Sequence, residues 1–163
     1  MTKPFVSIVG AGPGDPSLIS VRGLRHLANA DVVIHDHLIP RRLIQLASPE
    51  AEVIDVGAAS LTKSVEQDAI SILLAEKARE GQKVVRLKWG DPFVFDSGAK
   101  EALFLDKQGI PCELVPGIPT TIGTPTYAGM PITHPDAGDT LVLVRGHEDG
   151  TDLLPDVDWK SLA

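Results

Sequence analysis

Short apolar runs alternate with amphipathic stretches along most of the chain, and this alternation predicts strands and helices in turn. Five apolar runs have the length of single strands: 5–9, 32–34, 53–56, 84–87 and 111–115. The segments between them show helical spacing or helix signals: 16–28, 40–47, 65–79, 98–108 and 120–128. We therefore expect an α/β fold with a doubly wound, mainly parallel five-stranded sheet and helices on both faces.

The helix at 65–79 has the clearest amphipathic pattern, and Gly81 ends it. Its apolar stripe consists of Ile70, Leu73, Leu74 and Ala78. Two other helices carry capping signals. Asp15 or Ser17 is expected to cap the helix after the first strand, and Ser97 is expected to cap the helix that begins at Gly98.

The last part of the chain departs from the alternation. Residues 130–139 contain two prolines and a glycine and resemble a linker, whereas 140–145 predicts one more strand. We expect a domain at 1–135, followed at 136–163 by the start of a truncated second domain or a C-terminal arm. The extra strand should join the edge of its own domain, pair with a second copy or be disordered, and we expect a homodimer.

Composition narrows the class of protein. The chain has 163 residues, of which 43% are hydrophobic, and a formal net charge of −7, which argues against nucleic acid as the main partner. No apolar run is long enough to span a bilayer, and the N-terminus lacks a signal-peptide pattern. The single cysteine, Cys112, allows no intrachain disulfide. We expect a cytoplasmic globular protein without a membrane partner.

Turn residues follow several predicted strands. Gly14, Asp36, Gly90 and Gly117 each come soon after a strand. Because the carboxyl ends of parallel strands share one edge of a sheet, these residues should converge there on a cleft for a small molecule. Asp91 is the main acidic candidate in that cleft, and the alternative is that it only folds the turn in which it lies.

The turn at 10–16, Gly-Ala-Gly-Pro-Gly-Asp-Pro, has part of the pattern of a dinucleotide site. Asp36 even falls where a ribose-binding acid would lie. However, Asp15 stands in place of the third glycine and would repel a pyrophosphate, and Pro13 lacks an amide donor. We do not expect an NAD site, so the turn either binds another ligand or only connects a strand to a helix.

Two histidines flank Asp36. Strand alternation would place His35 and His37 on one face as a possible metal pair, with Asp36 on the other face. No third ligand is evident, so solvated or hydrogen-bonded histidines are the favoured interpretation and no metal site is expected. Asp36 is either a functional carboxylate or a residue that caps a helix or forms a salt bridge.

Taken together and in order, these turns resemble the tetrapyrrole (corrin/porphyrin) methylase family. The matching segments are 9–16, 30–36, 84–88, 90–95, 115–118 and 127–134. The resemblance extends from about residue 5 to residue 147. It implies transfer of a methyl group from S-adenosyl-L-methionine to a carbon of a tetrapyrrole such as uroporphyrinogen-III.

The resemblance also implies roles for individual residues. The cofactor-contacting positions are Pro13, Trp89, Gly90, Asp91, Val94, Pro119 and Thr120, and the proton acceptor is Asp36. A carboxylate such as Asp91 suits a cofactor with a cationic sulfonium. Because the reaction is a displacement at a methyl carbon, alignment of the reactants should dominate catalysis.

Several positions depart from the family pattern. Trp89 replaces a glycine, and its indole either fills the cofactor space or swings away and stacks on a ring. Ala58 replaces a lysine, Pro119 replaces a threonine, and Asp-Ser-Gly-Ala-Lys-Glu at 96–101 replaces Gly-Arg-Gly-Gly-Glu-Glu. The last change loses an arginine suited to a substrate carboxylate. An alternative is therefore a non-catalytic or repurposed homologue that acts as a binding or interaction module.

Overall fold

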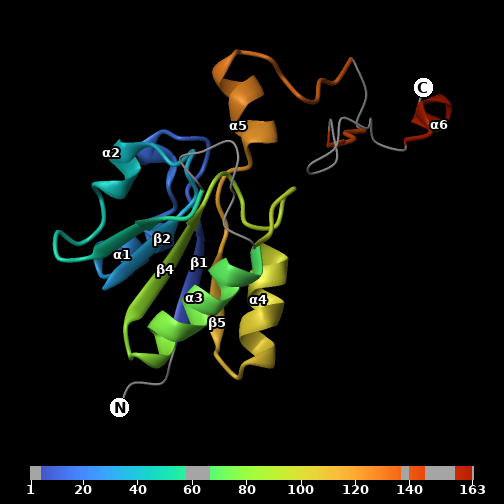
Figure 1. Cartoon of the computed structure of the whole chain (residues 1–163). Coiled ribbons are helices and arrows are strands. Elements are labelled where there is room, and N and C mark those ends of the chain that lie inside the picture. Colours follow the sequence, from blue (N-terminus) through green and yellow to red (C-terminus); the bar gives the residue numbers. More distant parts are fainter. Residues whose placement is uncertain (1–4, 58–66, 137–139, 146–156, 163) are drawn as a thin grey trace.

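The computed structural model describes residues 5–57, 67–136, 140–145 and 157–162 (Figure 1). Its centre is a five-stranded sheet in the order β3-β2-β4-β1-β5, and all of its strand pairs are parallel. The strands are β1 (Phe5–Gly10), β2 (Val32–His35), β3 (Glu52–Asp55), β4 (Lys83–Lys88) and β5 (Cys112–Val115). The expected fold class is confirmed.

Helices cover both faces of the sheet (Figure 1). One face packs against α1 (Val21–Ala28) and α2 (Arg41–Ile44), and the other against α3 (Gln67–Arg79) and α4 (Gly98–Lys107). The remaining helical elements are η1 (Pro16–Leu18) after β1, α5 (Thr120–Tyr127) beyond the carboxyl ends of the strands, and α6 (Trp159–Leu162) near the end of the chain. Within the described ranges, no helix has both the length and the apolar character needed to cross a bilayer.

Alternation along the strands divides the interior into two cores. The core against α3 and α4 includes Val6, Ile8, Val32, Ile34, Val84, Leu74 and Leu105. The core against α1 and α2 includes Val9, Val33, Val85, Leu87, Leu27 and Leu43. The same alternation places Arg86 and Lys88 of β4 on the side of Val84. Trp89, just past the end of β4, packs against the other core, which includes Leu87.

The expected stripe of α3 is confirmed, because Ile70, Leu74 and Ala78 are buried. The expected caps are wrong in two places. Asp15 caps only the short η1, accepting a hydrogen bond from the Ser17 amide, whereas the Ser20 hydroxyl caps α1. Ser97 occupies the N-cap position of α4 but makes no capping hydrogen bond, because its hydroxyl is engaged with Lys88.

The strand expected at 140–145 is absent from this described segment, whose backbone pairs with no strand of the sheet. A strand is stabilised by a neighbouring backbone, and apolar sequence alone does not provide one. Leu141, Val142 and Leu143 are exposed. The segment touches the domain through Arg145, which donates a hydrogen bond to the Phe95 carbonyl over 2.7 Å. The domain boundary at 135/136 stays a prediction.

Candidate active site

Three glycine-containing loops meet at the carboxyl edge of the sheet. Gly12 and Gly90 form an antiparallel bridge, with each amide donating to the other carbonyl over 3.0–3.1 Å. A Cβ on Gly10 would lie 2.5 Å from the Gly117 nitrogen and 2.6 Å from the Gly90 oxygen. Because backbone cannot yield as a side chain tip can, Gly10 has no tolerance for a larger residue. The expected convergence of the loops after β1, β4 and β5 is confirmed.

Asp91 connects two of these loops. One carboxylate oxygen accepts the Phe93 amide over 2.9 Å, and the other accepts the Gly117 amide over 3.2 Å. The carboxylate therefore folds its own turn and also fastens the β4 loop to the β5 loop. Asp91 also borders the cavity described next. The structure is therefore compatible with both interpretations of this residue, as an acidic group in a cleft and as a residue that folds its turn.

A cavity of about 260 Å³ lies between the β4 loop and the start of α5. Its lining residues are Trp89, Gly90, Asp91, Val94, Phe95, Asp96, Pro119, Thr120 and Thr121. This carboxyl-edge cavity brings together six of the seven expected cofactor positions. Pro13, the seventh, lies instead against α5, where a Cβ added to Gly123 would be 3.0 Å from its ring.

One polar atom of this cavity is unsatisfied. Thr121 Oγ1 is buried and has no hydrogen-bond partner within the part of the chain that the structure describes. A buried hydroxyl without a partner costs free energy. Thr121 also lines the cavity, together with the carboxylate residues Asp91 and Asp96.

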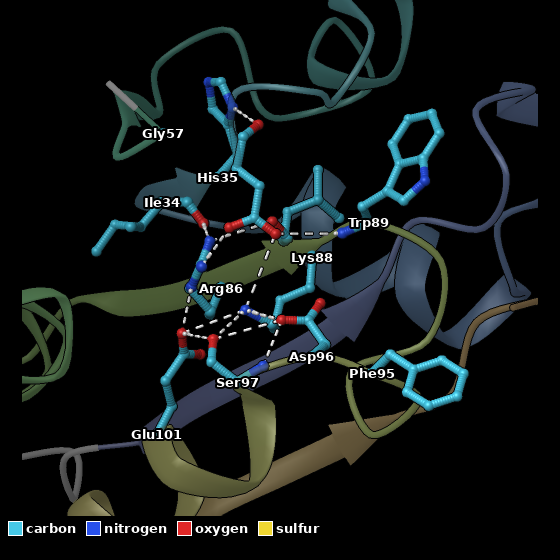
Figure 2. A network of polar contacts seen from close by, with 12 residues as sticks. Ile34, His35, Gly57, Arg86, Lys88, Trp89, Phe95, Asp96, Ser97 and Glu101 are labelled. Carbon is cyan, nitrogen blue, oxygen red and sulfur yellow. Dashed lines mark hydrogen bonds and ion pairs between the residues drawn. The ribbon is translucent and has the colours of Figure 1, made fainter. Parts of the chain in front are cut away.

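The Trp89 indole lies on the side of the α1 and α2 core. It packs against that core, and a Cβ added to Gly14 would lie 3.0 Å from the ring, with Pro40 also close. Figure 2 shows the ring pointing away from the charged residues of the neighbouring face. The indole therefore fills space between the β1 loop and α2, and it contributes only part of the cavity wall.

Asp36 is held from two directions. Arg86 Nη2 donates to one oxygen of its carboxylate, and the Trp89 amide donates to the other over 3.3 Å. The Arg86 side chain is only 1% exposed, and it also donates from Nε to Glu101 over 3.2 Å. Although burial by itself lowers the Arg86 pKa, Glu101 and Asp36 together raise it, so this guanidinium is a permanent cation.

Lys88 lies beside this pair, again with a side chain only 1% exposed. Its Nζ is 2.8 Å from Asp96, 2.9 Å from the Ser97 hydroxyl and 3.3 Å from Glu101. Burial raises the pKa of the Asp96 carboxyl above its usual value, although Lys88 acts in the opposite direction. We refer to Asp36, Arg86, Lys88, Asp96 and Glu101 as the inner charge cluster (Figure 2).

Most of this cluster was not anticipated from the sequence. Arg86, Lys88 and Glu101 were not expected at the site, and Asp96 was noted only as a departure from the family pattern. A signal was present: Arg86 and Lys88 fall two apart in a strand expected to be buried on both faces. Buried cations require carboxylate partners, and α4 supplies Glu101.

The two histidines that flank Asp36 each contact a different neighbour. His35 is buried and bonds through Nδ1 to the Asp36 carbonyl over 2.8 Å. β2 ends at His35, so His37 lies in a turn and strand alternation no longer applies to it; its Nδ1 contacts Asp55 over 2.9 Å. Nowhere in the described ranges do three or more potential ligands gather around a common point. Ala58 lies outside the described residues.

A second and larger cavity, of about 670 Å³, lies at the amino ends of β1 and β4. Beside it, the Ser7 hydroxyl is 3.0 Å from His26 Nδ1, and Glu113 is 3.1 Å from both His26 Nε2 and Arg22. We refer to Arg22, His26 and Glu113 as the outer charge cluster. Their side chains are partly or largely exposed, so water competes for each contact.

The edges formed by the amino ends and the carboxyl ends of the strands therefore differ in how deeply their charged groups are buried. At the carboxyl edge, three loops from separate strands meet, and a cavity and a buried charge cluster lie beside them. Ligands of open α/β sheets bind at this edge. The fold and the site thus define an α/β ligand-binding domain whose crevice lies between the β4 loop and the start of α5.

Comparison with known proteins gives the family. The model of the Tetrapyrrole (Corrin/Porphyrin) Methylases matches residues 6–163. The chain is 48% identical over 159 residues to siroheme synthase 2 of Pectobacterium atrosepticum, covering 97% of this chain and 34% of that protein. It is 48% identical over 143 residues to uroporphyrinogen-III C-methyltransferase of Methanocaldococcus jannaschii, covering 88% of this chain and 59% of that protein. The chain belongs to the tetrapyrrole methylase family.

A solved structure agrees with this assignment. Uroporphyrin-III C-methyltransferase of Thermus thermophilus, complexed with S-adenosylhomocysteine, matches with 42% identity and a TM-score of 0.66. The match covers 79% of this chain and 53% of that protein. The chain thus spans between about a third and three-fifths of the length of these relatives.

Proposed function

We propose that this chain forms the cofactor-binding part of an S-adenosyl-L-methionine-dependent C-methyltransferase that acts on a tetrapyrrole such as uroporphyrinogen-III. The observation that carries the proposal is the shared cavity of six expected cofactor positions, in a chain that belongs to the methylase family. Its volume of about 260 Å³ is below the range of roughly 300–1,000 Å³ typical of whole ligand pockets. These residues would therefore form one wall of the complete site.

The residues present fit such a cofactor. Asp91 supplies negative charge beside the cavity, which suits a cationic sulfur, and Val94 supplies an apolar lining residue. When bound, S-adenosyl-L-methionine provides a methyl group activated by a cationic sulfur. Two backbone amides fix the Asp91 carboxylate, so its orientation need not change when the cation arrives.

Asp36 is suited to accept the proton that the ring system must lose, from another position, after a methyl group is added to a ring carbon. Its carboxylate is 27% exposed, whereas its partner Arg86 is 1% exposed, so the carboxylate is the member of the pair that a ligand can reach. The bond from the Trp89 amide fixes the second oxygen. Asp36 would therefore be oriented before the substrate binds, which favours proton transfer at a defined atom.

A thermal-shift experiment with S-adenosylhomocysteine tests whether the cavity binds the cofactor. At one hundred times its dissociation constant, a ligand stabilises the folded state by about 2.7 kcal/mol. Because the indole lies toward Gly14, we expect a shift in the wild type and in Trp89→Gly alike. Trp159→Gly, at an exposed tryptophan of α6, is the matched control. A shift in Trp89→Gly alone would mean that the indole closes the cavity.

The charge on Asp91 gives a sharper test. S-adenosyl-L-methionine is cationic at sulfur and S-adenosylhomocysteine is neutral there, so calorimetric titration with both isolates the charge effect. We expect Asp91→Asn to weaken binding of the cationic ligand by about tenfold more than binding of the neutral one. Asp106→Asn, on the exposed side of α4, should change neither. Failure of the wild type to bind either ligand would contradict the proposed function and favour a non-catalytic homologue.

A homodimer and a cytoplasmic location stay predictions. The exposed side chains of Leu141, Val142 and Leu143 are one part of the described surface that a second copy could cover. Sedimentation velocity at several protein concentrations measures the association directly. A single monomeric species at all concentrations would contradict the dimer.

A further inference from the structure

The larger cavity, at the amino ends of β1 and β4, has the size of a whole ligand site. Its volume of about 670 Å³ falls within the range of roughly 300–1,000 Å³ that is typical of pockets for small organic molecules. It shares no lining residue with the carboxyl-edge cavity, which lies at the opposite edge of the sheet. We refer to it as the amino-edge cavity.

The negative charge in the lining of this cavity is already paired. Among the described residues that line it, only Glu113 carries a carboxylate. One oxygen of Glu113 is 3.1 Å from Arg22 Nη1, and the other is 3.1 Å from His26 Nε2. His26 Nδ1 in turn lies 3.0 Å from the hydroxyl of Ser7, a residue only 3% exposed. These contacts hold Glu113 in place, and Arg22 offsets its charge.

Two further cations, Arg25 and Lys83, line the cavity. Arg25 lies in the last turn of α1 and Lys83 begins β4, so the two cations come from different elements. In the part of the chain that the structure describes, neither side chain makes a hydrogen bond or an ion pair. The nearby carboxylate of Asp31 accepts the Lys83 backbone amide over 2.8 Å and does not line the cavity.

The lining therefore has an excess of positive charge. Its three permanent cations face one carboxylate, a surplus of two charges with His26 counted as neutral, in a chain whose formal net charge is −7. A cation in the last turn of a helix also interacts favourably with the helix dipole, which explains Arg25 by itself. The dipole of α1 explains neither Lys83 on β4 nor the open volume between the two residues.

We propose that the amino-edge cavity binds a small organic anion that carries at least two oxyanion groups, either carboxylates or phosphates, and that Arg25 and Lys83 bind these groups. Guanidinium and ammonium groups are the usual partners of carboxylate and phosphate oxygens. Phe5, which also lines the cavity and is 39% exposed, would contact the organic part of the molecule. The site is separate from the cofactor cavity, so this inference does not depend on the proposed function.

Calorimetric titration at low salt tests the site with two probes. Citrate presents carboxylates and fructose 1,6-bisphosphate presents phosphates, so the tighter of the two shows which oxyanion the cavity prefers. The double variant Arg25→Gln, Lys83→Gln should weaken binding of the tighter probe about tenfold or more. Both side chains are exposed, so the variant should keep the fold.

The matched control is the double variant Arg41→Gln, Lys100→Gln. It removes one guanidinium and one ammonium from exposed positions that do not line the amino-edge cavity. Its affinity for the probe should stay within about twofold of the wild type, because long-range charge effects on the surface are screened. An equal loss in both double variants would show a response to net charge alone and would overturn the inference.

Nuclear magnetic resonance locates the bound anion without any variant. Addition of the tighter probe to the wild type should shift the amide signals of Ser7, His26 and Val85 most strongly. If the largest shifts occur at Gly90 and Gly117 instead, the anion occupies the carboxyl edge and the inference is wrong. Absence of binding of both probes at millimolar concentration overturns it as well.

A titration in the presence of S-adenosylhomocysteine keeps this inference apart from the proposed function. We expect the dissociation constant of the anion to be the same with and without that ligand, since the two cavities lie at opposite edges. Displacement of the anion by S-adenosylhomocysteine would overturn the amino-edge site and leave the proposed function standing. Binding of the anion at the amino edge by a protein that does not bind S-adenosylhomocysteine would have the reverse meaning.

Discussion

The inner and outer charge clusters occupy opposite edges of one sheet and differ in almost every physical respect. Arg86, Lys88 and Glu101 are enclosed, and carboxylates, a hydroxyl and backbone carbonyls surround the two cations. Arg22 and Glu113 pair in contact with water, next to the larger cavity. Cavity volume alone would favour the amino edge. Burial of charge indicates the carboxyl edge as the candidate active site instead. A protein buries charged groups at a cost in free energy that only specific partners offset.

The largest effect should come from Arg86→Met. The substitution leaves Glu101 and Asp36 without their guanidinium, and breaking a buried ion pair typically costs about 3–5 kcal/mol. Urea denaturation at pH 7 measures the loss of unfolding free energy. The double variant Arg86→Met, Glu101→Leu removes one uncompensated carboxylate and should recover part of that loss. A double variant less stable than the single one would show that the cluster is not held by charge balance.

A smaller effect is expected from Asp96→Asn, and it should depend on pH. Burial raises the Asp96 pKa although Lys88 lowers it, so the folded state binds this proton more tightly than the unfolded state. The contribution of Asp96 to the stability of the wild type must then fall as the pH rises from about 4 through the raised folded-state pKa. Asparagine does not titrate, so the stability of the variant relative to the wild type should increase between pH 3.5 and pH 7.

Urea midpoints at both pH values measure this gain, with Asp106→Asn as the control for removal of an exposed carboxylate. If Asp96→Asn has a lower free energy of unfolding than the wild type at pH 7, attraction to Lys88 outweighs the cost of burying the Asp96 carboxylate. The inner charge cluster would then need the full carboxylate for stability.

The smallest effect belongs to the outer charge cluster. Glu113→Gln removes the partner of Arg22 and His26, but exposed ion pairs contribute less than about 1 kcal/mol. Urea denaturation at low and high salt should show a small loss that disappears at high salt. A loss comparable to that of Arg86→Met would remove the distinction between the two edges.

Local sequence patterns predicted the sheet, because each strand has an apolar run and the turns after the strands are marked by glycine, proline or aspartate. They also predicted the meeting of Gly90 and Gly117, since parallel strands end on one edge. They could not predict which carboxylate meets Arg86, because Glu101 lies fifteen residues further along on a helix. That pairing depends on how α4 packs on the sheet.

Other misses have equally specific causes. Ser97 fits the rule for helix caps, but a buried ammonium nearby competes for its hydroxyl. Residues 140–145 have the sequence of a strand but no neighbouring strand to pair with. The direction of Trp89 was left open by the sequence, and the structure packs its indole against the core on the side of Val85 and Leu87.

The contact between Gly10, Gly90 and Gly117 has a consequence for folding. These three glycines follow β1, β4 and β5, which are far apart in the sequence, and yet their backbones touch. The cavity can therefore form only after β1 has paired with β4 and with β5, the two strand pairs with the longest intervening chain. The carboxyl-edge cavity is therefore expected to be among the last parts of the molecule to form. Binding capacity and global structure should be lost together on heating, and amide hydrogens in all three loops should exchange with one common free energy of opening.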